Sequence, residues 1–578
     1  MNVENQVIEL AKKRGFLWNS FELYGGAAGF YDYGPLGSTL KRNIENTWRK
    51  IYVIEEGFME IETPTIGIES VFQASGHIGG FSDPMCECKE CKEGFRADHL
   101  LNDIEEIPDT LSNIELDLLI LKNNIKCPEC KGELGPAREF NLMFKTNIGP
   151  GSGRVGYLRP ELAQGMFVNF QRIARFYRDK LPFGATQIGK SYRNEISPRQ
   201  GIIRLREFTQ AEVEIFIDPR DKTHPNIDRF KETILNIHSN EFSGFMKVTD
   251  AIEKGLIAHE FLAYHISCVN HFLIKVGIDS KKLRFRQHKK DEMAHYAIDC
   301  WDAEIETERF GWIEVVGIAD RTDYDINAHA KMSENDISIY IEYDEPKINR
   351  MLIITPDMKQ LGPMFKGDAK KVSDALKNLT ESELKKEMIA VTIDGKACTI
   401  PNFMVKYSIE DVKISGENIV PHVIEPSYGI DRIFYCVLEH AFDEEILISK
   451  EEEESRIVLR LKPQIAPIQV AVLPLLTKSE LIIPAKEIVE KFHAKGIIVT
   501  YDDSGTIGRR YRRNDEIGTP YTITIDYQSL DDGTVTIRDR DSMKQTRIAI
   551  NNIENTVYDL INGVSEFAIS LDGVIKIV

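Results

Sequence analysis

The sequence predicts a mixed α/β chain, with an antiparallel sheet flanked by helices, several insertions and a separate C-terminal α/β domain. Three observations carry this prediction. Residues 187–216 alternate polar and apolar side chains on both sides of a turn-rich break at Ser197–Gly201, which is typical of an antiparallel hairpin. Apolar residues at helical spacing follow Ser38. From Gln469 onward the pattern changes to strand, helix and strand.

Composition limits the class of protein. The 578 residues are 42% hydrophobic, which is typical of a globular chain, and by length they should form about three or four domains. We expect a cytoplasmic protein with no membrane contact, because the sequence shows neither a membrane-spanning apolar run nor a secretory signal. The net charge of −19 disfavours general nucleic-acid binding, so any such binding must depend on local basic patches.

The N-terminal part predicts a loop followed by a long helix. Residues 1–36 are rich in glycine and aromatic side chains, and we expect a packed loop with a short strand there. The helix that begins near Ser38 places on one stripe the apolar residues Leu40, Ile44, Trp48 and Ile51. It ends near Gly57 and leads into a strand over 58–63, which Pro64 stops. By themselves, these residues indicate an ordinary core helix and strand.

Cysteines cluster in residues 81–139, on either side of a helix expected over 104–125. Nine cysteines outside a secretory context are expected to be free thiols or metal ligands. Two C-x-x-C pairs have the spacing of a tetrahedral zinc site: Cys88, Cys91, Cys127 and Cys130. Cys86 is a spare or competing ligand, and free thiols at chance spacing are the alternative. Four thiolates leave no open coordination position, so such a zinc would be structural.

The polar face of the 187–216 hairpin suits a nucleoside triphosphate. Arginine side chains match phosphate oxygens and stay charged at any working pH. The ring of Phe208 can stack on a purine. A hairpin whose charges are merely solvated is the alternative, but arginines outnumber carboxylates between Arg193 and Arg206. The pattern R-x-E followed by R-x-x-x-F resembles motif 2 of the class II aminoacyl-tRNA synthetases. The whole run from Arg193 to Glu212 resembles the glycyl-tRNA synthetases of the archaeal and eukaryotic type.

Other stretches resemble the same family and together cover nearly the whole chain. The helix, strand and proline up to Pro64 resemble motif 1, which in the family forms the dimer interface. Glu425–Arg432 resembles motif 3, and the C-terminal region resembles an anticodon-binding domain. Three further family strings are Phe95–His99, Tyr157–Phe167 and Gly311–Asp325.

The resemblance implies roles for individual residues. Arg193 and Arg432 would be catalytic, supporting charge on the phosphates. The implied ATP-binding residues are Arg193, Asn194, Glu195, Arg204, Leu205, Phe208, Glu314, Val315, Arg321, Gly429 and Arg432. Glycine would be held by Arg96, Glu161, Glu212, Glu425 and Ser427, with Glu425 also a Mg²⁺ ligand. From its position after Pro160, Glu161 can also be read as favouring the first turn of a helix.

The family also implies a domain plan and a reaction. A catalytic core would be split over residues 1–80 and 140–450. The insertions are predicted from the residues themselves: the cysteine-rich zinc-binding segment 81–139, a polar, helical insertion over 220–306, and a charged, irregular third insertion over 345–417 of open role. Residues 464–578 would form the anticodon-binding domain. A homodimer would join glycine to ATP, releasing pyrophosphate, and pass it to the 3′ end of tRNA-Gly. An inactive nucleic-acid-binding relative is the alternative, but it should have lost the motif 2 and motif 3 arginines.

Two basic runs are candidate RNA contacts. Residues 281–290 mix lysine, arginine and histidine with phenylalanine, and we expect either a solvated face or contacts with RNA phosphates. In the C-terminal domain a dense positive patch is formed by Arg509, Arg510, Arg512 and Arg513.

Two other strings resemble the nucleotide-binding signatures of class I synthetases. His77–Gly80 and Lys331–Glu334 occur in the right order. Each lacks its last functional residue, and neither has the parallel βαβ surroundings of a Rossmann site. We interpret both as coincidence.

Overall fold

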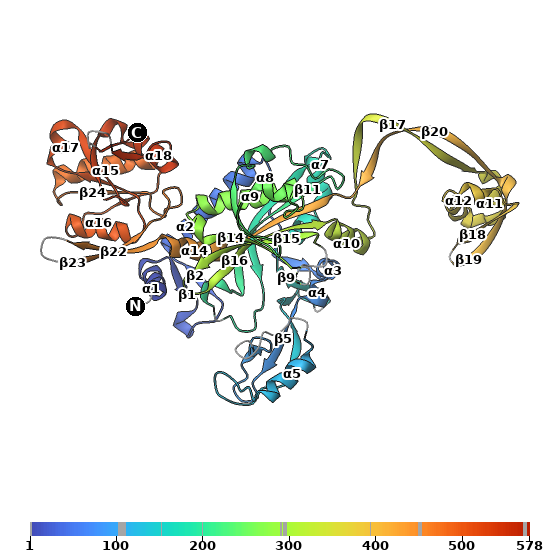
Figure 1. Cartoon of the computed structure of the whole chain (residues 1–578), viewed down its shortest axis with the longest axis horizontal. Helices are drawn as coiled ribbons and strands as arrows, with labels where there is room; N and C mark the ends of the chain where they lie inside the picture. Colours follow the sequence, from blue (N-terminus) through green and yellow to red (C-terminus); the bar gives the residue numbers. More distant parts are fainter. Residues whose placement is uncertain are drawn as a thin grey trace. The chain divides into compact units, whose positions relative to one another are not determined.

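The computed structural model describes residues 3–101, 111–151, 153–198, 200–289, 292, 297–393, 395–448, 453–569 and 575–577. The chain forms two units. One comprises residues 1–337 and 420–578, and the other residues 338–419 (Figure 1). Among the described residues no helix is long and apolar enough to span a bilayer.

A nine-stranded sheet lies at the centre of the first unit (Figure 1). Its neighbours pair antiparallel except at β12–β14 and β10–β3, which confirms the predicted antiparallel sheet. In spatial order the strands are β13 (Ser243–Lys247), β12 (Ile234–His238), β14 (Leu283–Gln287), β15 (Asp299–Thr307), β16 (Gly311–Thr322), β21 (His422–Gly429), β11 (Glu207–Ile217), β10 (Phe183–Tyr192) and β3 (Met59–Glu60).

The predicted hairpin is β10 and β11. Their register sets Gln187 opposite Glu212 and Ser191 opposite Phe208. On β11 the apolar residues of the alternation, Ala211, Val213 and Ile215, are buried in the main core, as predicted. The polar residues between them therefore point to the opposite face of the sheet.

Three helices pack on the apolar face: α2 (Pro35–Arg49), α9 (Glu260–Lys275) and α14 (Ile430–Ala441). Leu40, Ile44 and Trp48 of α2 are fully buried, which confirms the predicted stripe. A π-helical stretch, Lys50–Glu55, extends α2 toward β3. Figure 1 shows α9 running across the strands.

The N-terminal region differs from the prediction. A helix, α1 (Val3–Arg14), precedes β1 (Leu17–Asn19) and β2 (Tyr31–Tyr33), where only a loop and a short strand were expected. Val7, Leu10 and Ala11 lie on its buried side at helical spacing. The glycine-rich sequence that suggested a loop begins only at Gly15, after this helix.

The prediction of a helical insertion over 220–306 is wrong. The segment contains α8 (Val248–Glu253) and α9, but it also supplies β12 to β15 of the central sheet. The basic run lies largely on β14, where the arginines pair with carboxylates of β15. Arg284 Nε lies 2.6 Å from Glu304 Oε2, and Arg286 Nη2 lies 2.8 Å from Asp302 Oδ2. These pairs favour a structural role for the arginines over RNA contact, whereas Lys290 lies outside the described residues.

Smaller elements connect the cysteine-rich segment to the core. That segment has the sheet β6-β5-β7, made of Gly94–Arg96, Ser82–Glu87 and Arg138–Asn141, and the helix α5 (Asn113–Lys122). Residues 104–110 of the predicted helix lie outside the described residues. The sheet β4-β9-β8 comprises Ile66–Ile68, Val155–Leu158 and Lys145–Asn147. Short helices nearby are α3 (Glu69–Ala74), α4 (His77–Gly80), α6 (Ala163–Phe167), α7 (Phe170–Phe176) and α10 (Tyr324–Ser333).

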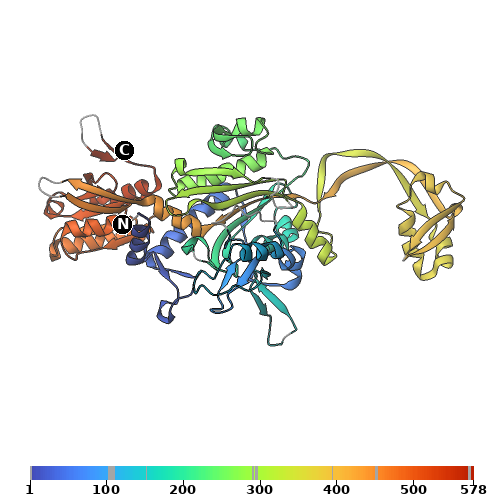
Figure 2. The same cartoon turned by 60° about the horizontal axis from the view of Figure 1, so that its bottom comes forward.

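The second unit has its own core. A long ribbon of β17 (Ile339–Pro356) and β20 (Val405–Ile419) leads to the hairpin β18 (Met388–Ile393) and β19 (Lys396–Pro401) (Figure 2). Three helices complete it: α11 (Met358–Phe365), α12 (Ala369–Leu376) and α13 (Glu381–Leu384). Leu361, Val372, Leu376 and Ile400 are fully buried. The third insertion over 345–417, for which the sequence analysis predicted no role, therefore lies in a folded domain.

The C-terminal domain is the predicted α/β unit. Its sheet has the order β25-β24-β26-β27-β28, formed by Val499–Tyr501, Val470–Pro474, Tyr521–Ile525, Thr534–Asp539 and Gln545–Ala549. Its helices are α15 (Ser479–Ala494), α16 (Ile507–Glu516), α17 (Tyr527–Asp532) and α18 (Ile553–Asn562). The hairpin β22 (Phe442–Ile448) and β23 (Glu453–Leu459) precedes it, and β29 (Phe567–Ile569) pairs with β30 (Ile575–Ile577).

Candidate active site

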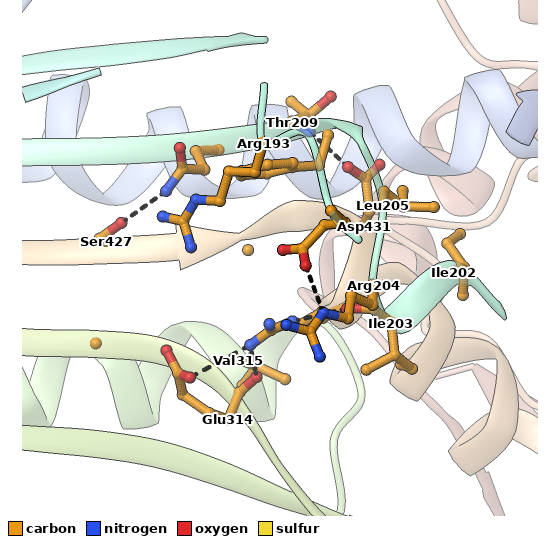
Figure 3. A pocket seen from close by; sticks show the side chains of 16 residues that line it. Arg193, Ile202, Ile203, Arg204, Leu205, Thr209, Glu314, Val315, Ser427 and Asp431 are labelled. Carbon is orange, nitrogen blue, oxygen red and sulfur yellow. Dashed lines mark hydrogen bonds and ion pairs between the residues drawn. The ribbon is translucent and has the colours of Figure 1, made fainter. Parts of the chain in front are cut away.

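A pocket of about 170 Å³ opens on the polar face of the central sheet (Figure 3). The β10–β11 connection, β16, β21 and the start of α14 all contribute to its lining. Residues far apart in the chain meet here because β11 and β16 both pair with β21. Their polar faces therefore line one continuous surface.

Three arginines face this pocket, and each is held by neighbouring groups. Arg193 lies between two aromatic rings, 5.4 Å from the centroid of Phe81 and 5.3 Å from that of Phe208. Figure 3 shows Arg204 on the side of the pocket opposite Arg193. Arg204 Nε donates to Glu195 Oε2 at 2.7 Å. Arg432 Nη1 donates to the backbone oxygen of Glu314 at 2.8 Å. Held guanidinium groups of this kind form a rigid binding surface for phosphate oxygens.

A buried node braces the floor of the pocket. Lys41 Nζ on α2 donates to Asp431 Oδ1 at 2.7 Å and to Thr209 Oγ1 at 2.6 Å. Tyr33 also donates to Asp431, and the backbone nitrogen of Thr209 donates to Asp431 Oδ2 at 2.5 Å. Burial alone would raise the pKa of Asp431, but the ammonium groups of Lys41 and Lys190 bring it below its usual value. Asp431 directly precedes Arg432, so this node braces the start of α14 next to the arginine.

We expect Lys41→Met to lower the melting temperature strongly, because it leaves the buried carboxylate of Asp431 without its counter-ion. Breaking a buried pair in this way costs about 3–5 kcal/mol. The double variant Lys41→Met/Asp431→Asn should recover part of the loss, since neither charge remains. Thermal unfolding of both variants checks this. If Lys41→Met is as stable as the wild type, the Lys41–Asp431 ion pair does not stabilise the fold.

Next to the pocket lies a cluster of buried carboxylates. Glu212 and Glu214 on β11 and Glu425 on β21 each place one oxygen within 4.8 Å of the others. Arg321 Nη1 donates to Glu425 Oε2 at 2.7 Å, and Arg321 is also bonded to Asp325. Both carboxylate oxygens of Glu214 are without a hydrogen-bond partner among the described residues. The carboxylates outnumber the guanidinium that neutralises them, which favours binding of a small cation such as an ammonium group.

Glu212 and Glu161 differ in how their pKa values shift. Burial, together with the carboxylates of Glu425 and Glu161, raises the pKa of Glu212 to about 8. Its oxygens accept from the Leu162 backbone nitrogen at 2.8 Å and from Ser427 Oγ at 2.9 Å. Burial alone would raise the pKa of Glu161, but His77 and Arg321 bring it well below its usual range. The two carboxyls therefore differ: their surroundings favour the ionised form of Glu161 and the neutral form of Glu212.

Comparison with known proteins decides the family. Residues 151–441 match the tRNA synthetase class II core domain (G, H, P, S and T), and residues 469–560 match the anticodon binding domain. A "Glycine--tRNA ligase" of Methanothrix thermoacetophila is 57% identical over 97% of this chain and 98% of its own length. One from Methanocaldococcus jannaschii is 50% identical over 96% and 98%. The chain belongs to the glycine–tRNA ligase family of class II synthetases.

A more distant structure shows the same fold. Prolyl-tRNA synthetase of Giardia lamblia, solved with prolyl-adenylate, aligns with a TM-score of 0.52 at 13% identity, covering 97% of this chain and 79% of that one. This confirms the predicted class II core with a C-terminal anticodon-binding domain.

Most residues that the family resemblance assigned to ATP do line the pocket. They are Arg193, Glu195, Arg204, Leu205, Phe208, Glu314, Val315, Gly429 and Arg432. Asn194 is not among the lining residues, and its backbone nitrogen donates to the Leu142 oxygen at 2.6 Å. Arg321 is not among the lining residues either and lies in the carboxylate cluster, bonded to Glu425 and Asp325.

Two further assignments do not fit the geometry. Arg96 was predicted to bind glycine, but its guanidinium pairs with Asp98 and Asp83, 3.0 Å from Asp83 Oδ2. It belongs to the base of the cysteine-rich segment. Glu425 was predicted to bind Mg²⁺, but its carboxylate is buried against Arg321 and is not part of the pocket lining. Glu314, by contrast, lines the pocket beside Arg432.

The other glycine-binding candidates do come together. Glu212 and Ser427 are partners across β11 and β21, and Glu161 lies just before α6. Glu161 does not cap that helix: its Oε1 accepts from the Gln164 side chain at 2.8 Å.

Sequence reasoning missed several groups of the cluster. Gln164 Nε2 also donates to Asp325 Oδ1 at 3.1 Å, and His77 Nε2 lies 3.6 Å from Glu161 Oε2. The spacing of Glu212 and Glu214 on one strand face was a usable signal for Glu214. The sequence analysis set aside the string that contains His77 as coincidence, and it gave Gln164 no role within Tyr157–Phe167.

The cysteine cluster has the geometry that was predicted for two knuckles. One sulfur of each of Cys88, Cys91, Cys127 and Cys130 lies within 4.8 Å of the others. Cys88 Sγ is 3.4 Å from Cys130 Sγ, and Cys91 Sγ is 3.6 Å from Cys127 Sγ. Four sulfurs about 2.3 Å from a tetrahedral zinc would be about 3.8 Å apart, so the residues fit this ion. Cys86 lies outside the set, in an apolar cluster with Leu116 and Ile120.

The C-terminal arginines divide into two kinds. Arg510 is buried and donates to the backbone oxygen of Gly505 at 2.8 Å. Arg513 pairs with Asp502 at 2.5 Å. Arg509 is exposed on α16. The patch expected for RNA is therefore smaller than the sequence suggested.

Proposed function

We propose that this chain activates glycine with ATP and transfers it to the 3′ end of tRNA-Gly, with the residue roles given below. The observation that carries the proposal is the contact between the two pockets. Gln210 and Ser427 line the arginine pocket and are hydrogen-bonded to each other at 3.3 Å, and Ser427 also donates to Glu212. An amino acid held by its ammonium at Glu212 would direct its carboxylate toward a nucleotide held by the arginines.

In the first step, a glycine carboxylate oxygen attacks the α-phosphorus of ATP. The bond from that phosphorus to the bridging oxygen breaks, and pyrophosphate leaves. Arg193 supports the charge that develops on the α-phosphate, while Arg204 and Arg432 hold the β- and γ-phosphates. The rings of Phe81 and Phe208 hold the Arg193 guanidinium, and Phe208 also offers a face to adenine. No side-chain nucleophile is required.

Mg²⁺, when bound, would neutralise charge on the β- and γ-phosphates. The carboxylate of Glu314 is the protein group suited to hold it. It lies 3.4 Å from Arg432 Nη1 and is half exposed to the pocket. A hard, exposed oxygen donor beside a phosphate-binding arginine fits the ligand preference of this ion.

Selectivity for glycine follows from crowding. Glu161, Glu212 and Ser427 hold the ammonium group, so an amino acid with a Cβ would have to displace a buried side chain. Excluding a larger amino acid by steric clash is effective, whereas gripping one extra methylene is worth only about 1–3 kcal/mol.

The transfer step needs RNA and, by our proposal, a second subunit. The C-terminal domain, with Arg509 exposed on α16, would bind the anticodon arm. The outer edge of the central sheet at β3, next to the exposed side chains of Ile54 and Met59, would pack against the same edge of a second copy.

Glycine-dependent exchange of pyrophosphate into ATP tests the proposal directly. We expect exchange with glycine and little with alanine or serine, followed by glycylation of a tRNA-Gly transcript. Binding of tRNA without any exchange would instead support the inactive nucleic-acid-binding relative.

We also propose that the four clustered cysteines hold one structural zinc. Purified protein should contain about one zinc per chain, because the four thiolates close the coordination shell. Cys127→Ser should lose the zinc and make residues 88–137 sensitive to protease. Elemental analysis and limited proteolysis measure both effects.

Cys86→Ala is the matched control, since its thiol lies outside the cluster, and it should keep the metal. Wild-type protein without zinc, or equal loss in the control, would contradict the assignment.

A further inference from the structure

The segment between α3 and β5, residues 75–81 and here called the turn, contains the short helix α4 and touches both halves of the active site. It contains the His77–Gly80 string that the sequence analysis set aside as coincidence. His77 lies beside the glycine pocket, and Phe81 lies beside Arg193. A single short segment thus contacts a carboxylate proposed for the amino acid and an arginine proposed for the α-phosphate.

His77 is oriented by its neighbours. Its Nδ1 lies 2.7 Å from Ser75 Oγ, and its ring meets Phe72 and Phe81 edge to face at 6.3 and 5.5 Å. When the Ser75 hydroxyl donates to Nδ1, the ring hydrogen resides on Nε2. That hydrogen then faces Glu161 Oε2, 3.6 Å from Nε2.

Glu161 is consequently held at both oxygens. Gln164 Nε2 donates to Oε1 at 2.8 Å, and His77 faces Oε2. Without His77, the carboxylate of Glu161 would lose a group that favours its ionised form, and its Oε2 would be free to rotate. His77 therefore favours the rotamer in which Oε2 faces the ring and Oε1 faces Gln164.

Phe81 acts on Arg193 in a parallel way. The guanidinium carbon lies 5.4 Å from the Phe81 centroid and 5.3 Å from that of Phe208, within the range of cation–π attraction. Phe208 is also the ring proposed to stack on adenine, so Phe81 is the contact that does not compete with the nucleotide. It keeps the arginine in place when ATP is bound.

The turn itself is fixed by the strand that returns from the cysteine-rich segment. Asn141 Nδ2 donates to the backbone oxygens of His77 and Ile78 at 3.0 and 3.1 Å. The backbone nitrogen of Leu142 donates to the Phe81 oxygen at 3.0 Å. Gly76 has a φ of 80°, which favours glycine at the start of the turn.

We propose that residues 75–81 are a positioning element of the active site, in which His77 orients Glu161 for glycine and Phe81 holds Arg193 for the α-phosphate. The inference rests on the roles proposed above for Glu161 and Arg193. It adds two positioning residues from a segment outside motifs 1 to 3, and it predicts that each acts on a different substrate.

The test compares kcat and the KM values for glycine and ATP in glycine-dependent pyrophosphate exchange. Variants of His77 and of Phe81 should change different parameters. His77→Ala should raise the glycine KM about fivefold, because it removes the imidazole that faces Glu161 Oε2 at 3.6 Å, with the ATP KM within about twofold. His77→Gln should restore most of the loss, because its amide nitrogen can reach the place of Nε2, whereas His77→Asn should not.

Phe81→Leu should lower kcat about tenfold with the glycine KM within about twofold, because the ring rather than the volume holds Arg193. Phe81→Tyr should keep near wild-type kcat. Phe140→Leu is the matched control: this aromatic residue pairs with Asp83 in the adjacent strand, and its loss should leave both parameters unchanged.

If a variant changes the KM values for glycine and ATP equally, or lowers the melting temperature without separating the two kinetic effects, the proposal is overturned and the turn has a purely structural role. Glu161→Gln is measured alongside. If it leaves the glycine KM unchanged while His77→Ala raises it, the role of Glu161 fails, and with it the proposed path from His77. A raised glycine KM in both variants, with rescue by His77→Gln, supports both steps.

Discussion

Arg193→Ala is expected to lower glycine-dependent pyrophosphate exchange by about 10²–10³-fold, which is the loss seen when one group that stabilises developing charge is removed. The structure supports a loss of this size because Arg193 is already held by Phe81 and Phe208 before substrate arrives. Such a preorganised cation needs little reorganisation during the reaction. The effect should fall mainly on kcat, because charge on the α-phosphate develops in the transition state.

The fold of this variant should be intact. Arg193 Nε donates to the Pro160 oxygen at 3.3 Å, a long hydrogen bond, and the side chain lies on the polar face of the sheet. Arg175→Ala on α7 is the matched control, since it removes an exposed arginine away from the pocket. Melting temperatures close to wild type are expected for both. Exchange within a few fold of wild type in Arg193→Ala would show that another group supports the α-phosphate.

The hairpin could be predicted from the sequence because the information is local. In a strand the side chains alternate between faces, so the apolar residues of β11 determine which face is buried. For segment 220–306 the same kind of reasoning gave a wrong prediction, because four strands of the central sheet lie where a helical insertion was expected. On β14 and β15 the charged residues Arg284, Arg286 and Glu304 neutralise each other across strands. In the sequence they read as a polar, helical stretch, and only the pairing of strands shows that they belong to a sheet.

The candidate site was predictable only as far as family motifs reached. Motif residues identified the arginines and the carboxylates of Glu212 and Glu425. How they combine is non-local, because β21 brings Glu425 beside a strand more than 200 residues earlier. That contact, and not any motif, places Arg321 against Glu425 in the carboxylate cluster, where neither residue lines the arginine pocket. His77 lies in a string that the sequence analysis interpreted as coincidence, and only the folded chain places it beside Glu161.

The second large effect is expected at Glu212. Glu212→Gln keeps the shape of the side chain but removes the charge that binds the glycine ammonium. Loss of one partner of a buried ion pair costs about 3–5 kcal/mol, which is a fall of about 10²–10³-fold or more in kcat/KM for glycine. ATP binding should change little, because Arg193 and Arg432 are untouched. Pyrophosphate exchange over a range of glycine concentrations measures the first effect, and equilibrium binding of ATP the second.

Ser427→Ala is the graded control for this pocket. It removes one neutral hydrogen bond to Glu212, worth about 1 kcal/mol, so the loss should be about five- to tenfold. Glu161→Gln should be closer to Glu212→Gln in severity. A serine variant more damaged than both glutamine variants would mean that the ammonium pocket has been assigned to the wrong residues.

The pH dependence separates a role in glycine binding from a role in folding. Because the pKa of Glu212 is raised to about 8, its carboxyl is largely neutral in the free enzyme at pH 7 and must lose a proton to bind an ammonium group. The kcat/KM for glycine should therefore rise about tenfold per pH unit below pH 8 and level off above it, and Glu212→Gln should lose this slope.

The contribution of Glu212 to the stability of the fold should change with pH in the opposite direction. The raised pKa means that the neutral carboxyl favours the folded state, so this contribution is complete below the ordinary value of 4.5 and is lost as the pH rises through 8. Glutamine stays neutral throughout. The melting temperature of Glu212→Gln, measured relative to that of the wild type, should therefore increase between pH 6 and 9. A variant that loses activity and also becomes relatively less stable as the pH rises would show that Glu212 is ionised in the free enzyme.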